Sequence, residues 1–268
     1  MTNTLISIAI VVAIVAVFAT RFVLKHMRRK RARRAPFPDN WLKIITRNLP
    51  VYKKLPRELQ AQLQEAVKIF LAEKTFEGYE GVVIDDEIRL TVASQACLLI
   101  LNRKNNYYPH LDTICIYPSA FLEKDPGPDG RRHARIGESW TRGSVVLAWD
   151  HSKGDARNFH DGHNVVIHEF SHQLDQLDGS SDGAPILEDR SCYQSWANVL
   201  SKDYMKLRKK VKNRQRDILD EYGATNPAEF FAVASEVFFE RPDAMKKKHP
   251  ELFEELKRYY KVAPEEWL

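Results

Sequence analysis

The pentapeptide His168-Glu169-Phe170-Ser171-His172 constrains this chain more than any other stretch of its sequence. Residues four apart lie on one face of an α-helix, about one turn apart, so the two imidazoles can reach the same metal ion. Apolar residues precede and follow the pentapeptide, at Val165, Val166, Ile167, Leu174 and Leu177. The pattern predicts a buried helix with one polar stripe, and that stripe is suited to hold a zinc ion.

The carboxylate of Glu169 lies beside the metal in this arrangement. It is placed to take a proton from a zinc-bound water, whose pKa the metal lowers toward about 7, and to pass the proton to the leaving amine. The alternative is a pair of core histidines satisfied by their neighbours. That alternative gives no reason for Glu169 and Asp175 to share the stripe, because buried charges need partners. We therefore expect peptide-bond hydrolysis, with Asp175 holding a ligand imidazole in its tautomer.

The third ligand of a catalytic zinc is expected in the segment 222–236. Asn226 and Pro227 predict the start of a helix, as its N-cap and its first residue. Glu229 and Glu236 are seven residues apart, so they share a face of that helix. Glu229 could instead close a capping box by bonding the Asn226 N–H. The residues alone leave both glutamates open as the third ligand.

The N-terminus contains a nearly unbroken apolar run from Leu5 to Leu24, long enough to cross the roughly 30 Å hydrocarbon core of a bilayer. A cleaved signal peptide is the alternative, but the usual positive residues before the apolar run are missing. Basic residues accompany and follow the run, at Arg21, Lys25, Arg28, Arg29, Lys30, Arg31, Arg33 and Arg34. By the positive-inside rule, we expect a single-pass helix in the cytoplasmic (inner) membrane, with the rest of the chain in the cytoplasm. The basic flank would meet anionic lipid headgroups, or it would act only as a topology signal without a specific lipid partner.

The basic cluster accounts for the net charge of +5. Without the eight residues of this cluster, the rest of the chain has 33 Lys and Arg and 36 Asp and Glu. That remainder is mildly acidic, which argues against direct nucleic-acid binding. Cys97, Cys115 and Cys192 are far apart and form no disulfide framework, so we expect reduced thiols.

Hydrophobic periodicity predicts an α+β fold, mainly helical with a small mixed sheet, preceded by one transmembrane helix. Helices are expected near 57–74, 86–102, 192–211, 227–240 and 250–260, and strands near 76–85, 113–117, 134–139 and 144–149. Residues 124–132 are expected to form a loop. A strand near 143–147 is expected to be the sheet edge that holds an extended substrate. The expected divisions are an anchor at 1–24, a basic linker at 25–40 and a zinc metallopeptidase domain at 41–268.

Two separated motifs, residues 168–175 with Asp178-Gly179 and residues 226–239, resemble the zinc-dependent peptidases of the Mlc titration factor A family. The similarity extends over most of the stretch from Leu55 to Tyr260. It implies a zincin-type fold of the gluzincin group, akin to the anthrax lethal factor protease domain, with one Zn²⁺ per chain. It also implies roles for five residues: His168, His172 and Glu229 as metal ligands, Glu169 as general base, and Tyr222 as a hydroxyl on the oxyanion side.

The expected function is a membrane-anchored, cytosol-facing zinc-dependent peptidase that acts on a peptide or protein substrate. The resemblance implies an alternative, a regulatory interaction protein that binds and inactivates a transcriptional repressor of sugar uptake. An esterase or amidase would use the same zinc chemistry. From position alone, Tyr222 would be a surface loop tyrosine, and His160 and His163 are also expected on the surface.

Overall fold

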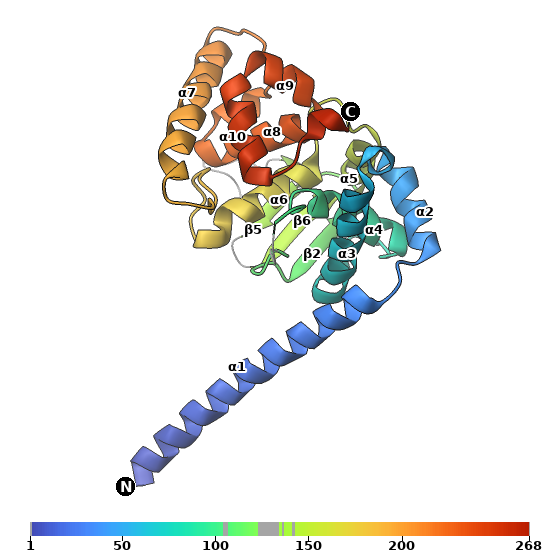
Figure 1. Cartoon of the computed structure of the whole chain (residues 1–268), viewed down its shortest axis with the longest axis vertical. Helices are drawn as coiled ribbons and strands as arrows, with labels where there is room; N and C mark the ends of the chain where they lie inside the picture. The colour runs from blue at the N-terminus through green and yellow to red at the C-terminus, as the bar shows by residue number, and fades with distance from the viewer. Residues whose placement is uncertain (1, 104–106, 123–133, 136, 141–142, 268) are drawn as a thin grey trace.

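The structure is a computed structural model that describes residues 2–103, 107–122, 134–135, 137–140 and 143–267 (Figure 1). In chain order, its helices are α1 (Thr2–Arg34), α2 (Asp39–Asn48), α3 (Arg57–Glu73), α4 (Asp86–Leu98), α5 (Trp149–Arg157), α6 (Val165–Asp175), α7 (Cys192–Lys212), α8 (Pro227–Glu240), α9 (Pro242–Lys248) and α10 (Pro250–Tyr260). Its strands are β1 (Thr75–Gly78), β2 (Thr113–Tyr117), β3 (Phe121–Leu122), β4 (Ala134–Arg135), β5 (Gly137–Trp140) and β6 (Ser144–Ala148). The loop predicted at 124–132 lies outside the described residues.

The larger sheet is mixed and has the strand order β1-β2-β6-β5. Strands β1, β2 and β6 are parallel, and Thr113 of β2 pairs with Thr75 on one side and with Ser144 on the other. Strand β5 runs antiparallel to β6, with Gly137 opposite Leu147. The predicted α+β fold with a small mixed sheet is therefore confirmed. The edge strand next to β6 is β5, so the prediction of an edge near 143–147 is wrong.

Helix α6 lies between two groups of elements (Figure 1). On one side it packs against β5, β6, α4 and α5, and on the other side against α8. Helices α7, α9 and α10 in turn pack against α8. The predicted helices at 57–74 and 227–240 are confirmed as α3 and α8. This arrangement buries α6 on almost every face, so its polar residues must find partners inside the protein.

Side-chain caps start the helices that surround the centre of the fold. Asp85, Asn164 and Asn226 precede α4, α6 and α8, and each accepts a hydrogen bond from the backbone N–H three residues later, at 2.9 to 3.0 Å. Each cap satisfies a donor that the first turn of a helix leaves without an intrahelical partner. The starts of α6 and α8 therefore follow from local sequence.

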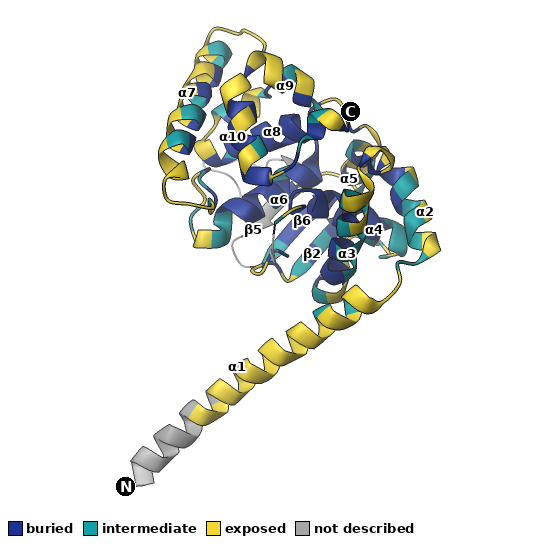
Figure 2. Cartoon of the chain, in the orientation of Figure 1, coloured by how far each residue is buried: buried dark blue, intermediate teal, exposed yellow. Residues whose placement is uncertain are grey.

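Helix α1 runs without interruption through 33 residues (Figure 2). Its C-terminal end packs along α3, where Arg29 pairs with Glu73 and Arg33 pairs with Glu65. The basic residues that the sequence assigned to a linker therefore continue the helix. The charges of Lys25, Arg29 and Arg33 pair with carboxylates of α3.

The predicted transmembrane helix is not supported. Among the residues that the structure describes, no helix has the length and apolar character needed to span a bilayer. This finding contradicts the single-pass location in the cytoplasmic (inner) membrane. The apolar run of residues 5–24 belongs to a longer helix whose final turns carry the basic cluster and pack against α3.

A buried ion cluster ties the middle of α7 and the segment after α7 to the start of α10. The Nδ1 atom of His249 lies 3.1 Å from Asp203 Oδ1, and its Nε2 atom lies 2.9 Å from Asp217 Oδ1. Both ring nitrogens face carboxylates, so both carry protons when the cluster is complete. Burial alone would lower the pKa of His249, but the hydrogen bonds to Asp203 and Asp217 outweigh it and raise the pKa to about 8.

This raised pKa predicts a loss of stability in mild alkali. The charged form of His249 stabilises the folded state. This stabilisation is fully present below the unfolded pKa of about 6.5 and is lost as the pH rises through about 8. The difference in unfolding free energy between wild type and His249→Asn should shrink by about 2 kcal/mol between pH 6 and pH 9. Denaturant unfolding across this range measures it. His160→Asn, at an exposed histidine, is the control. If the difference in unfolding free energy between wild type and His249→Asn stays constant from pH 6 to pH 9, the imidazole of His249 is not charged in the folded protein.

Candidate functional site

A cavity of about 980 Å³ lies beside α6. Its wall is formed by β5, α5, α6, the loop after α6, the 3₁₀ turn η3 (Glu221–Ala224) and α8. The titratable residues described in the wall are acidic, histidine or tyrosine: His151, Asp155, His163, His168, Glu169, His172, Asp182, Asp220, Tyr222, Glu229 and Glu236. The wall therefore favours cationic groups over anionic ones.

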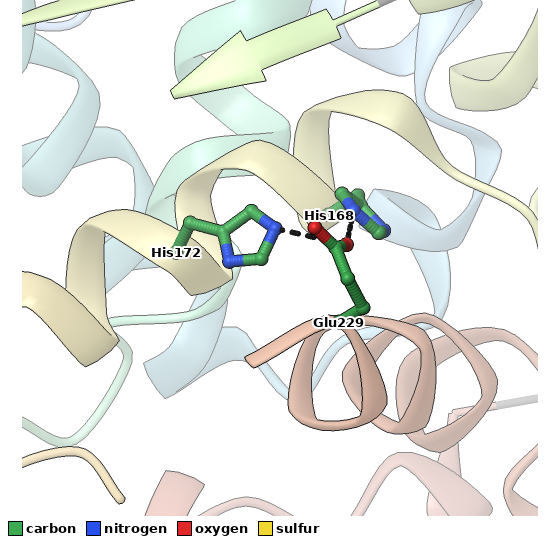
Figure 3. A group of neighbouring side chains, drawn as sticks. All are labelled: His168, His172 and Glu229. Atoms are coloured by element: carbon green, nitrogen blue, oxygen red, sulfur yellow. Dashed lines mark hydrogen bonds and ion pairs between the residues drawn. The ribbon is translucent and has the colours of Figure 1, made fainter. Parts of the chain in front are cut away.

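Three of these side chains converge on one point of the wall (Figure 3). The Nε2 atoms of His168 and His172 lie 2.9 Å and 3.3 Å from the same carboxylate oxygen, Oε2 of Glu229. One donor atom from each of the three residues falls within 4.8 Å of the other two. Two imidazole nitrogens and one carboxylate oxygen form a donor set typical of catalytic metal sites. The residues present therefore fit a bound metal ion.

Helix α6 brings the two imidazoles together. His168 and His172 are one turn apart, and their ring centroids are 4.9 Å apart with an interplanar angle of 81°. Every residue of α6 other than His168 is buried. The helix is therefore held rigidly by packing, which fixes the spacing of the two rings.

Glu229 reaches the imidazoles from the first turn of α8. Its backbone N–H donates to the Asn226 side chain at 3.0 Å, which confirms Asn226 as the N-cap. Its carboxylate does not stay with the cap but turns to His168 and His172. Burial would raise the pKa of Glu229, but the hydrogen bonds from the two histidines hold it well below its usual range. An anionic oxygen therefore faces both rings.

Glu236 occupies the opposite side of the first ring. Its Oε1 atom lies 2.7 Å from His168 Nδ1, and its Oε2 atom accepts a hydrogen bond from Asn164 N at 2.6 Å. The structure thus separates the two glutamates that the sequence left open. Glu229 lies between the two histidines, and Glu236 lies behind one of them.

Glu169 is buried in the wall next to the edge strand β5. A Cβ atom at Gly137 of β5 would lie 2.5 Å from Glu169 Oε1 and 2.6 Å from Val165 Cγ2. Only glycine lets β5 approach the Glu169 side chain this closely. Sequence analysis did not identify Gly137, since nothing local marks this approach.

Tyr222 stands in η3 at the rim of the cavity. Its side chain is 46% exposed, and its ring centroid lies 5.9 Å from that of His168. Asp220 caps η3 by accepting a hydrogen bond from Tyr222 N at 2.8 Å. The exposure agrees with a loop tyrosine, but the neighbouring ring is one of the clustered histidines. The position therefore allows a hydroxyl to reach a molecule in the cavity.

Asp175 does not have the partner that the sequence suggested. Its carboxylate, predicted to hold a ligand imidazole, accepts a hydrogen bond from Gly183 N at 2.9 Å. Burial raises the pKa of Asp175 to about 6. Gly183 has a φ of +77°, and a Cβ atom there would lie 2.4 Å from Pro227 O. Asp175 therefore fixes the loop that packs against the start of α8.

The other loop residues divide into two groups. His160 is exposed, as predicted. His163 is also exposed, but it lines the cavity and its Nε2 atom lies 3.9 Å from Asp220 Oδ2. Asn164 was not singled out from the sequence, although an asparagine directly before an apolar helix is a typical N-cap signal.

Comparison with known proteins identifies the family of this chain. Residues 24–261 match the family model described as glucose-regulated metallo-peptidase M90. An uncharacterized protein of Synechocystis, slr2042, is 40% identical over 244 residues, which cover 88% of this chain and 89% of that protein. Mlc titration factor A of Escherichia fergusonii is 28% identical over 247 residues, with 87% and 91% covered, and that of Salmonella arizonae is 28% identical over 240 residues, with 85% and 94% covered. The predicted resemblance is thus confirmed, and the chain belongs to the glucose-regulated metallo-peptidase M90 family.

Proposed function

We propose that this protein is a zinc-dependent peptidase of the zincin type, with His168, His172 and Glu229 as the zinc ligands. In this proposal Glu169 is the general base and Tyr222 is the hydroxyl that faces the oxyanion. The substrate is a peptide or a protein. Membership of a metallo-peptidase family supports the reaction class.

One observation carries the proposal. Two imidazole Nε2 atoms and one carboxylate oxygen converge in the wall of a cavity, and the buried carboxylate Glu169 lines the same wall. A purely structural histidine pair would need one partner for each ring. It would not need a further buried carboxylate such as Glu169, which lies between the two histidines in the sequence and lines the cavity.

The chemistry divides between the metal and the chain. When bound, zinc supplies a Lewis acid that polarises a carbonyl oxygen and lowers the pKa of a bound water toward about 7. Glu169 takes a proton from the attacking water and delivers it to the amine that leaves. Burial of Glu169 keeps this proton transfer away from bulk solvent.

Two other elements act on the substrate. The phenol of Tyr222 donates a hydrogen bond to the oxygen on which negative charge develops. Among the residues that the structure describes, β5 forms one edge of the larger sheet with β6 as its neighbour, and it passes beside Glu169. An extended peptide that pairs with this edge would bring its carbonyl next to Glu169.

A second candidate function is the capture of a transcriptional repressor. The relatives named Mlc titration factor A support it. Such binding requires a docking surface but no proton transfer. The two functions can therefore be separated by a substitution that removes the base and leaves the surface unchanged.

Glu169→Gln should strongly reduce peptide hydrolysis while zinc stays bound. The amide keeps the shape of the side chain but cannot accept the proton, which costs about 100- to 10,000-fold in turnover. Metal analysis and a peptide-library assay measure both properties, and Glu251→Gln at an exposed glutamate is the control. Wild-type turnover in Glu169→Gln would reject the general base. If the variant still captures a repressor, the second function is independent of catalysis.

Tyr222→Phe should lower turnover by about 100- to 1000-fold, because one oxyanion donor is lost. Zinc content and melting temperature should hold, since the ring is retained. Tyr79→Phe, another exposed tyrosine outside the cavity, is the matched control. Unchanged turnover in Tyr222→Phe would leave the tyrosine with a packing role only.

Gly137→Ala should reduce turnover because the added methyl group displaces the Glu169 carboxylate. Zinc should still bind, since the three atoms nearest to the added methyl group belong to Glu169 and Val165, which are not among the proposed ligands. Gly154→Ala is the control, because no atom outside its own helix lies within 4 Å of a Cβ atom there. Equal turnover in the two alanine variants would show that the close approach of β5 has no catalytic consequence.

A further inference from the structure

The His168 ring is held from both sides by carboxylates of α8. Its Nε2 atom lies 2.9 Å from Glu229 Oε2, and its Nδ1 atom lies 2.7 Å from Glu236 Oε1. A neutral imidazole carries its proton on one nitrogen only, and the nitrogen that binds a metal must be the one without it. A carboxylate at Nδ1 keeps the proton there and leaves Nε2 free for a metal.

Glu236 also fixes the start of the helix that carries this ring. Its second oxygen accepts a hydrogen bond from Asn164 N at 2.6 Å. The Asn164 side chain caps α6 by accepting from Ile167 N at 2.9 Å. One carboxylate therefore sets the position of the ring and of the first turn beneath it.

Glu236 is held in place by a buried network rather than by solvent. It is 6% exposed, and its partner Asn164 is 1% exposed. Asn164 Nδ2 donates to Gln95 Oε1 at 2.9 Å and to Glu240 Oε1 at 3.0 Å. Glu240, one turn after Glu236 on α8, also accepts from Gly162 N at 2.9 Å. These contacts leave the Glu236 carboxylate little freedom to turn away from His168.

We propose that Glu236 is a positioning residue for the metal site: its carboxylate holds His168 Nδ1–H and thereby directs Nε2 toward the metal. This inference rests on the proposed zinc site. A purely structural role, in which Glu236 only joins α6 to α8, would require the hydrogen bond to Asn164 but not the one to the imidazole.

The experiment measures the zinc affinity of the full chain by competition with a chelator. Glu236→Gln keeps the size of the side chain, but its amide has one acceptor oxygen for two N–H donors and carries no charge. Zinc should bind about 10- to 100-fold more weakly. Glu240→Gln is the matched control, because it makes the same change one turn away on α8, where the carboxylate accepts from Gly162 N and Asn164 Nδ2 instead of an imidazole. It should keep an affinity close to that of wild type.

Two results would overturn the inference. One is wild-type zinc affinity in Glu236→Gln, and the other is an equal loss of affinity in Glu240→Gln, which would indicate a structural role for the whole network. Should Glu236→Gln fail to fold by circular dichroism, nitrogen NMR of the zinc-loaded wild type decides: a proton on Nδ1 of His168 supports the inference, and zinc on Nδ1 rejects it. If the wild type binds no zinc, the proposed function fails instead.

Discussion

The burial of α6 is the constraint on which the rest of this structure depends. The helix is packed between the sheet and α8, so each polar group on it must be satisfied by the protein itself. Helix α8 supplies these partners from one face, with Glu229 and Glu236 on His168 and with Glu240 on the Asn164 cap. The contacts that satisfy the polar groups of the buried helix also orient its two imidazoles.

Much of this arrangement could be predicted because it is encoded locally. The helix α8 begins and ends where the Asn226-Pro227 start and the apolar pattern predict, at residues 227 and 240. The two histidines lie on one face of α6 because the helical repeat places residues four apart there. Cap residues and periodicity act within a few positions of the chain, so they can be recognised without knowledge of the tertiary fold.

The remaining features depend on contacts between distant segments. Glu229 and Glu236 share a helix face, and only the packing of α8 on α6 decides which of them lies between the two rings. The identity of the edge strand also depends on sheet order, which alternation along a strand does not encode. Asp175 illustrates the same point, because its partner Gly183 lies on a loop whose path follows the start of α8.

The charge balance of the cavity links folding to metal binding. Among the described residues of its wall, carboxylates are frequent and there is no Lys or Arg. Burial raises the pKa of Asp155 in this wall to about 6, which reflects the cost of placing negative charge there. Protonated histidines would offset that charge, but a protonated imidazole cannot bind a metal. A divalent cation offsets the negative charge of the carboxylates. It does so while the imidazoles remain neutral and able to bind it. The carboxylates and histidines of the wall therefore make the cavity unfavourable without a cation, and the same side chains suit it to bind a cation.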